Sequence, residues 1–491
     1  MAVLRAVIQF YTHNPKTGFS GMQTASESNR PWQVFFLVAI GVFMSTLDSS
    51  IVNVALPAIL KDFNTSLAMT EWVVMIYLLT ITCFLLTFGR LGDMLGRKRI
   101  YATGLLVFTL ASMLCAMAPN VQMLIGARLL QGLGSAMIMA CTPALLVDAF
   151  PDSQRGRVLG LNGAVVACGL TAGPAIGGFL LSLGSWRLIF YVNIPIGLLA
   201  TILVMMTLRE SGPQSRINAF DWQGTLLAAL SLGLLLMALT HGYDWGFNSL
   251  PFITVLILSL LCMALFILTE KKKKDPLLDI SLFHKRHFAL PALCGLLLFC
   301  SLFFMVFLMP FYLMLFAGYS SSLTGKMLMI PFAFLLIFSP LAGSLSDRMG
   351  SRLLCTTGLF IMACGMTMLS GLNASHGVWD IAWRMALVGI GTSIFVSPNS
   401  AAVMGGVPAA HRGSGGAVLA SARNLGMVLG VALAGAIFHF IFDSRSGGAS
   451  LAELSKNDMT IFIEAFGMAM GTGAAIAFFT MIPSWLRGSG K

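Results

Sequence analysis

Long runs of apolar residues, separated by short polar segments, fill the chain from about residue 32 to about residue 483. A helix needs about 20 apolar residues to cross the roughly 30 Å hydrocarbon core of a bilayer. Runs of this length predict an all-α polytopic membrane protein with fourteen spanning helices. They lie at about 32–57, 70–88, 100–118, 121–149, 158–183, 187–208, 221–241, 250–269, 288–316, 323–345, 353–371, 379–403, 414–441 and 460–483.

The composition agrees with this pattern and argues against a soluble protein. Of the 491 residues, 57% are hydrophobic and only 10% are charged, whereas an average soluble domain has about 25% charged residues. The nine cysteines all fall inside apolar runs, and no two have the CxxC spacing. We therefore expect neither a disulfide framework nor a metal site, and no cofactor.

Basic residues are distributed unevenly between the two sides of the predicted membrane. The net charge is +11, and 22 of the 30 Lys and Arg residues fall in loops on one side, against four in the opposite loops. Short loops rich in Lys and Arg stay in the cytoplasm. We therefore predict that both termini are cytoplasmic. The membrane topology then explains the net positive charge, and we expect no nucleic-acid partner.

One polar loop occurs twice. GRLGDMLGRKR at 89–99 follows the second span, and GSLSDRMGSR at 343–352 follows the tenth. The aligned residues are Gly89, Asp93 and Gly96 in the first loop and Gly343, Asp347 and Gly350 in the second. Such a repeat predicts two similar halves of six helices, with the seventh and eighth spans as an inserted pair, an architecture found in secondary transporters.

This division gives predicted domain boundaries. We expect an N-terminal tail at 1–31, a six-helix bundle at 32–208, the inserted helices with their charged linkers at 209–287, a second six-helix bundle at 288–484 and a C-terminal tail at 485–491.

Asp48 is the only one of the 19 acidic residues that lies deep in a predicted span. A carboxylate in the bilayer costs about 2.5 to 3.5 kcal/mol on insertion scales, so it should face a wet cavity, be paired or bind a proton. At about 1.5 Å per residue, Arg128 on the antiparallel fourth span comes to the same depth. We predict that Arg128 couples protonation of Asp48 to conformation. A purely structural role, in joining neighbouring helices, is the alternative for each residue.

For other polar side chains in the spans, the sequence predicts a role less specifically. Tyr77 and Asn193 reach a similar depth and could hydrogen-bond a substrate or Asp48, or only join helices. Together with Asn53 and Gln131, they are predicted to line the substrate cavity. Arg423, in the thirteenth span, is a buried cation with a structural or gating role. His241 and His439 lie near outer helix ends, and we assign no proton relay to them.

Six motifs together resemble the major facilitator superfamily, and within it the fourteen-helix drug:proton antiporter-2 family. They are the loop at 89–99, LIGARLLQGLGSA at 124–136, GAVVACGLTAGPAIGG at 163–178, LDSSIVNVALP at 47–57, WRLIFYVNIPIG at 186–197 and DWQG at 221–224. The resemblance implies the major facilitator fold, with two six-helix bundles and two inserted helices. It also implies a monomer in the cytoplasmic (inner) membrane of a bacterium.

The resemblance further implies two conformational elements. The first-half loop would latch one half to the other in an outward-open state, through Gly89, Asp93, Gly96 and Arg97, with Asp347 in the equivalent second loop. Gly173 and Pro174, in the fifth span, would form a hinge between the halves, because small residues permit close packing and proline bends a helix.

By function, the resemblance implies proton-coupled efflux of amphipathic or cationic drug-like compounds by alternating access. The partners would be a small-molecule substrate, protons and membrane lipids. Export of a specific metabolite, chelate or lipid-like molecule stays open, because Arg128 and Arg423 could serve an anionic cargo. A membrane enzyme or sensor is a third possibility, but the chain has no HExxH, GxSxG or phosphate-loop motif, so we expect no enzyme.

Overall fold

The computed structural model describes residues 30–208, 221–246, 248–273, 283–405, 412–447, 451 and 455–487. These residues include fourteen helices that are long and apolar enough to cross a membrane, as predicted, and no strand. Most of the predicted N-terminal tail, most of the two linkers around the inserted pair and the last four residues lie outside the described part of the chain.

The first six spans form one half of the molecule. They are α2 (Arg30–Asp62), α3 (Leu67–Leu95), α4 (Arg97–Ala116), α5 (Val121–Ala149), α6 (Asp152–Ser182) and the short α7 (Leu188–Tyr191), which leads into α8 (Asn193–Thr207). The first span continues through Pro57 to Asp62, beyond its predicted end. Proline is tolerated in such a helix because neighbouring helices compensate for the lost hydrogen bond.

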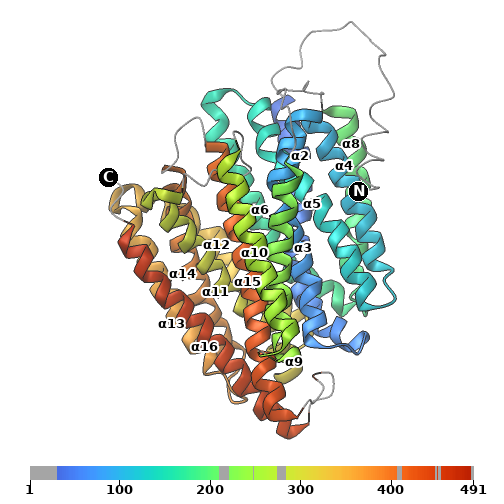
Figure 1. Ribbon diagram of the computed structural model, residues 1–491, viewed down its shortest axis with the longest axis vertical. Coiled ribbons are helices and arrows are strands. Elements are labelled where there is room, and N and C mark those ends of the chain that lie inside the picture. Colours follow the sequence, from blue (N-terminus) through green and yellow to red (C-terminus); the bar gives the residue numbers. More distant parts are fainter. Residues whose placement is uncertain are drawn as a thin grey trace, which may run out of the picture.

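The last six spans form the other half. They are α11 (Arg286–Phe311), which ends in the π-helical turn η2 (Tyr312–Phe316), α12 (Ser321–Met349), α13 (Ser351–Ser370), α14 (Val378–Gly405), α15 (Arg412–Ser446) and α16 (Lys456–Leu486). In Figure 1, most helices of this half lie on the left and most helices of the first half lie on the right.

The internal repeat is visible in the packing. In the first half α2 packs against α6, α3 against α5 and α4 against both α5 and α8; the second half repeats these pairs as α11–α15, α12–α14, α13–α14 and α13–α16. Gly96 and Gly350, in the duplicated loops, adopt φ values of 101° and 80°, which glycine tolerates best. Each of them ends one helix and begins the next.

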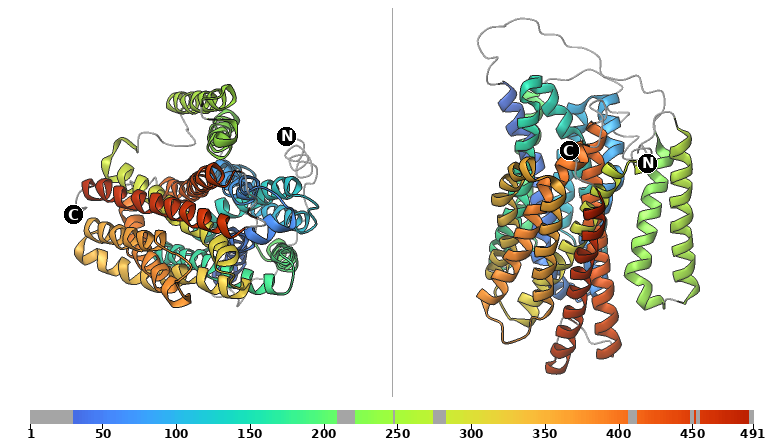
Figure 2. Two further views of the ribbon diagram at one scale, coloured as in Figure 1. Left: turned by 90° about the horizontal axis from the view of Figure 1, so that it is seen from below. Right: turned by 90° about the vertical axis from the view of Figure 1, so that its left-hand side faces the viewer.

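The inserted helices α9 (Trp222–Trp245) and α10 (Leu250–Lys272) stand to one side of the two halves (Figure 2). α9 packs against α3 of the first half and α15 of the second, whereas α10 packs mainly against α9. Only 11% of the most apolar stretch of α10 is buried. A helix so apolar and so exposed fits a lipid-facing position.

The two halves meet along α6–α12 and α3–α15. We call the membrane face with Gly96 and Gly350 the inner face, following the predicted topology, and the opposite face the outer one. Near the outer face, Gly178 of α6 touches Gly325 of α12 so closely that a Cβ on Gly178 would lie 2.9 Å from the Gly325 Cα.

Toward the inner face the same two helices diverge. Gly160 lies 18 residues before Gly178, which places both on one side of α6, five turns apart. Of the residues that the structure describes, none would lie within 4 Å of a Cβ on Gly160. The halves are thus closed against each other near the outer face and separate toward the inner face.

Candidate functional site

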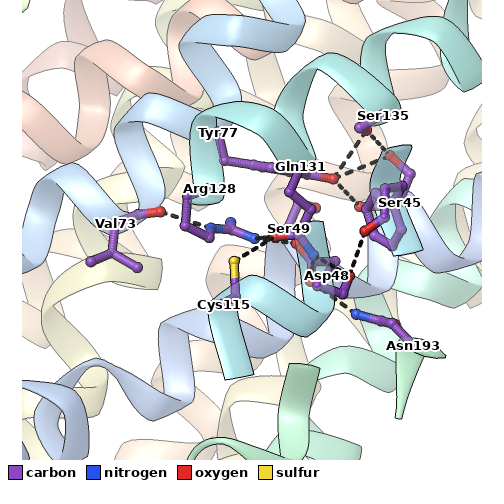
Figure 3. Close-up of polar contacts among 12 residues, drawn as sticks. Ser45, Asp48, Ser49, Val73, Tyr77, Cys115, Arg128, Gln131, Ser135 and Asn193 are labelled. Atoms are coloured by element: carbon purple, nitrogen blue, oxygen red, sulfur yellow. Dashed lines mark hydrogen bonds and ion pairs between the residues drawn. The ribbon is translucent and has the colours of Figure 1, made fainter. Parts of the chain in front are cut away.

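Asp48 of α2 and Arg128 of α5 form an ion pair in the interior of the first half (Figure 3). Both side chains are fully buried. Arg128 Nη1 donates to Asp48 Oδ2, and Arg128 Nε donates to the Val73 carbonyl oxygen at 3.0 Å. The two residues that sequence depth places at one level are therefore in direct contact, with the arginine also tied to the backbone of α3.

Two amide side chains complete the surroundings of the Asp48 carboxylate. Gln131 Nε2 donates to Asp48 Oδ1 at 2.9 Å, and Asn193 Nδ2 donates to the same oxygen at 3.2 Å. Gln131 Oε1 accepts from Arg128 Nη1 at 2.6 Å. Both carboxylate oxygens accept hydrogen bonds from donors that are themselves held in place. This arrangement suits an ionised Asp48, because charge-assisted hydrogen bonds and a cation offset the loss of water.

Tyr77 of α3 covers the arginine from another side. The Arg128 guanidinium carbon lies 4.1 Å from the centre of the Tyr77 ring, and Arg128 Nη2 has no hydrogen-bond partner in the described part of the chain. The Tyr77 hydroxyl lies 2.9 Å from the Ser45 carbonyl oxygen and 3.0 Å from Ser135 Oγ. Tyr77 thus connects the guanidinium, through a cation–π contact, to Ser45 on α2.

A partly open cavity lies beside this network, between the two halves, and about 330 Å³ of empty space, part of it open to solvent, belongs to it. Its wall comes from α2, α3, α5 and α6 of the first half and from α15 of the second. It is mostly apolar, and its polar residues are Ser45, Thr46, Ser49, Arg423 and Asn424. Ser45 belongs both to this wall and to the Tyr77 contact, so it joins the cavity to the Asp48 network.

The four residues predicted to line a substrate cavity lie outside the wall of this particular cavity. Tyr77, Gln131 and Asn193 surround Asp48 and Arg128, and Asn53 Nδ2 donates to the Ser49 carbonyl oxygen of its own helix at 3.0 Å. None of the four is in the cavity wall. Sequence gives the depth of a side chain in a span, but the rotation of each helix decides whether it faces the cavity or the interior of its own half.

Among the described residues, Arg423 is the one charged residue of the cavity wall. Its Nε is buried and makes no hydrogen bond within the described residues. The sequence indicates a buried cation in the thirteenth span, and the structure places this cation at the cavity between the halves. An unpaired guanidinium there gives the wall a positive charge.

The first duplicated loop is held within its own half. Arg97 Nη2 lies 2.8 Å from Asp93 Oδ1, and Arg97 Nη1 lies 2.6 Å from Asp148 Oδ2 at the inner end of α5. Gly89 has open space around it. In the second loop, Asp347 falls in the last turn of α12, but its side chain lies outside the described part of the structure.

The predicted hinge residues of α6 lie where three helices approach. Gly173 faces Ser50 and Ile51 of α2 without room for a Cβ, and the Pro174 carbonyl oxygen stands against Gly325 of α12. The small-residue face of α6 therefore packs on its own half and on the other half at once. This is the place where a rocking motion would change contacts.

Glu71 is a buried acid that sequence reasoning does not single out. It is 1% exposed, in the second turn of α3. In the sequence it falls at the edge of the predicted second span, where an acid normally reaches water. Its burial depends on α15 of the other half, and the sequence gives no signal of that contact.

A family model described as "Major Facilitator Superfamily" matches residues 38–431. The chain is 35% identical to the riboflavin transporter RibZ of Clostridioides difficile, over 92% of this chain and 96% of that protein. It is 33% identical to the multidrug resistance protein Stp of Mycobacterium tuberculosis, over 82% of this chain and 76% of that protein.

Among solved structures, the chain is similar to a bacterial homologue of the human lysosomal transporter Spinster in an inward-facing, unoccupied conformation. The TM-score is 0.70 at 15% identity, covering 94% of this chain and 98% of that one. At this identity the likeness supports the fold.

Proposed function

Because the chain belongs to the major facilitator superfamily, we propose that it is a proton-coupled efflux transporter that works by alternating access, with Asp48 as the proton carrier. Its substrates would be amphipathic or cationic drug-like compounds. The observation that carries the proposal is the buried Asp48–Arg128 pair, joined to the cavity wall through Tyr77 and Ser45.

The energy of this pair is large enough to couple protonation to conformation. Removing one partner of a buried ion pair typically costs about 3–5 kcal/mol. Inverting a two-state population from about 1:99 to about 99:1 takes about 5.5 kcal/mol. A proton that neutralises Asp48 therefore changes the energy of this half by nearly the amount that a conformational exchange requires.

The geometry suggests one place in the cycle for the observed state. The halves are open toward the inner face, and Asp48 is surrounded as an ionised carboxylate. This corresponds to a protein that has released its proton inward and can take up substrate. After the change to the outward-open state, an external proton would neutralise Asp48, free Arg128 and permit the return.

Flux in proteoliposomes tests the proposal, with ethidium as the cationic probe. We expect an imposed pH gradient to drive ethidium transport by the wild type and Asp48→Asn to reduce this transport at least about tenfold, which corresponds to about 1.4 kcal/mol. Glu464→Gln is a matched control, because Glu464 is an exposed acid that pairs with Arg445. Gradient-driven transport by Asp48→Asn at the wild-type rate would overturn the proposed role.

Export of a metabolite with anionic or hydrogen-bond-accepting groups is the second candidate function. Arg423 favours it, because the one charge that the described residues give the cavity wall is positive. The riboflavin transporter RibZ among the relatives also fits a substrate rich in acceptors. A cationic substrate would have to approach this guanidinium without a compensating acid in the described wall.

Two dyes on one ring system separate the candidates. Fluorescein is anionic and rhodamine 123 is cationic, while both share the xanthene core. If Arg423 selects acceptors, purified protein binds fluorescein more tightly, and Arg423→Gln weakens this binding about tenfold. Tighter binding of rhodamine 123, unchanged or improved in Arg423→Gln, would favour the cationic substrates instead.

A further inference from the structure

Glu71 lies at the seam where the two halves close near the outer face. Its side chain is 1% exposed and belongs to α3, which packs against α15 of the second half. Within the described residues, Glu71 forms no ion pair, and its Oε2 has no hydrogen-bond partner. A buried carboxylate without a cation or donors is costly, so the charge must be removed or the site must open.

Gly435 of α15 is what allows the carboxyl group to fit. A Cβ at position 435 would overlap the Glu71 carboxyl group, with Oε2 only 2.5 Å away. The glycine therefore forms a notch in α15 that receives the Glu71 side chain from the opposite half. Glu71 is buried only while α3 and α15 are together at this end.

The charged groups around the seam do not neutralise Glu71. On α9, Asp244 is close enough to repel a charge on it, and His439 Nε2 of α15 lies 3.0 Å from Asp244 Oδ1. Other charged or titratable side chains in the outer parts of the helices that pack against α3 are His241 on α9 near Asp244, Asp443 on α15 near His439, Arg445 on α15 paired with Glu464, Lys61 exposed at the end of α2 and Asp62 paired with Arg187. Deeper in the membrane, Arg128 on α5 pairs with Asp48 and Arg423 on α15 lies in the cavity wall, and toward the inner face Arg97 on α4 pairs with Asp148 on α5.

We propose that Glu71 is a second proton-binding site, which holds a proton while the outer seam is closed and releases it to the outside when the seam opens. Closure buries the carboxyl group in the Gly435 notch, and only the neutral form is stable there. Opening returns the group to water beside Asp244, where it ionises. The ligand is a proton taken from the outer solution.

This site would make closure of the outer seam depend on the external pH. It rests on the proposed alternating access, but not on Asp48 as the carrier. External acid would favour closure of the outer seam, and so the return of an empty transporter to the inward-open state. The proton on Glu71 would come from and return to the outer side, so it would gate the cycle without itself crossing the membrane.

Distance measurements between spin labels near the outer face test the proposal. The labels are placed at Lys61 of the first half and Ala374 of the second, both exposed. They are attached through a genetically encoded keto amino acid, because the chain has nine cysteines. The ratio of long to short distances is measured from about pH 5 to about pH 9, a range that spans ordinary and strongly shifted carboxyl titration.

If opening of the outer seam releases one proton, the ratio of long to short distances rises by up to about tenfold per pH unit. We expect Glu71→Gln to lose this rise with pH and to keep the seam closed at high pH. Glu71→Ala, a second neutral variant, should lose the rise as well. Glu464→Gln, the exposed-acid control, should follow the wild type. A Glu71→Gln protein with the wild-type pH response, or a wild type with none, would overturn the proposal. Asp48→Asn, measured in parallel, reports the coupling centre separately.

Discussion

Asp48 and Arg128 each depend on the other to be stable in an apolar interior. The carboxylate accepts hydrogen bonds from Arg128, Gln131 and Asn193, while the guanidinium is fixed by the Val73 carbonyl group and the Tyr77 ring. A charge left alone in this place would have neither water nor a counterion. The pair should therefore behave as a unit when either residue is replaced.

A double-mutant cycle measures this dependence. Asp48→Asn leaves the Arg128 charge buried, so we expect the free energy of unfolding in detergent to fall by about 3–5 kcal/mol. Adding Arg128→Gln removes the orphaned charge, and the double variant should recover most of the loss. Losses that simply add in the double variant would show that the two side chains act independently.

At this scale the sequence predicts the identity of the pair, but it leaves open whether Tyr77 and Asn193 contact a substrate or Asp48. Asp48 and Arg128 are recognised by depth, which follows from counting residues along a helix. The positions of Gln131, Asn193 and Tyr77 around the pair, rather than in the cavity wall, depend on helix rotation. The burial of Glu71 depends on Gly435, which lies in the other half.

Helix α6 is packed differently at its two ends. Its outer part packs against α12 at Gly178 and Gly325, whereas its inner part at Gly160 makes no contact with the described part of the chain on the same side. Small residues at a helix crossing allow the backbones to approach closely. A side chain at the crossing should therefore affect the closed outer seam, and one at the open end should not.

Two valine substitutions on one face of α6 test this contrast. Gly178→Val would push against the Ser321 carbonyl group and the Gly325 backbone, so we expect the free energy of unfolding to fall by about 1–3 kcal/mol. Gly160→Val, five turns away, is the matched control and should change it by less than about 0.5 kcal/mol. Equal effects of the two substitutions would mean that the halves do not diverge along α6.

The inserted helix α9 begins with a capped and charged first turn. Asp221 Oδ1 accepts from the Gly224 amide at 2.7 Å, and Lys273 at the end of α10 pairs with the same carboxylate. A Cβ on Gly224 would lie 2.5 Å from Asp221 Oδ2 and 2.7 Å from Glu270 Oε1. The DWQG motif at 221–224 thus has a structural explanation: Asp221 caps the helix, and Gly224 leaves room for two acids.

The stability of this turn should depend on pH. Burial pushes the pKa of Asp221 upward, but hydrogen bonds with Glu270, Lys273 and the Gly224 amide outweigh it and hold that pKa below its ordinary value. A carboxyl group whose pKa is lower in the folded than in the unfolded state stabilises the fold fully at pH values above its pKa in the unfolded chain. This stabilisation is lost as the pH falls through its pKa in the folded protein.

Hydrogen exchange at the Thr225 amide, corrected for intrinsic rates, measures this effect. We expect protection at about pH 6 that declines as pH approaches about 3, since Asp has an ordinary pKa near 3.9. Asp221→Asn should exchange about fivefold faster at about pH 6, as loss of about 1 kcal/mol of capping implies. Ser249→Ala, at the cap of α10 near the outer face, is the control. A pH-independent protection in the wild type would contradict the proposed stabilisation.

For the whole molecule, local sequence features predict a large part of the architecture. The number of spans follows from hydropathy, and the two like halves follow from one duplicated loop, whose glycines Gly96 and Gly350 adopt the same kind of left-handed backbone. A cavity is predicted, but the closed outer seam and the residues of the cavity wall are not, because they arise from contacts between helices far apart in sequence, such as Gly178 with Gly325.

Membrane orientation is a further prediction at this scale. The excess of Lys and Arg on one side predicts a cytoplasmic C-terminus. Green fluorescent protein fused after Lys491 should therefore fluoresce in bacterial cells, since it does not mature after Sec export. A fusion that is truncated after Ala374, near the predicted outer face, should stay dark. The opposite pattern would reverse the assignment of inner and outer faces.

Substrate-induced proton release tests the central claim, exchange of a proton for substrate at Asp48, most directly. Ethidium is added to purified protein in weakly buffered solution between about pH 5 and about pH 8, with a pH-indicating dye as the readout. The account predicts that the wild type and Glu71→Gln release protons on addition of ethidium and that Asp48→Asn releases none. Release from Asp48→Asn equal to that of the wild type would contradict it.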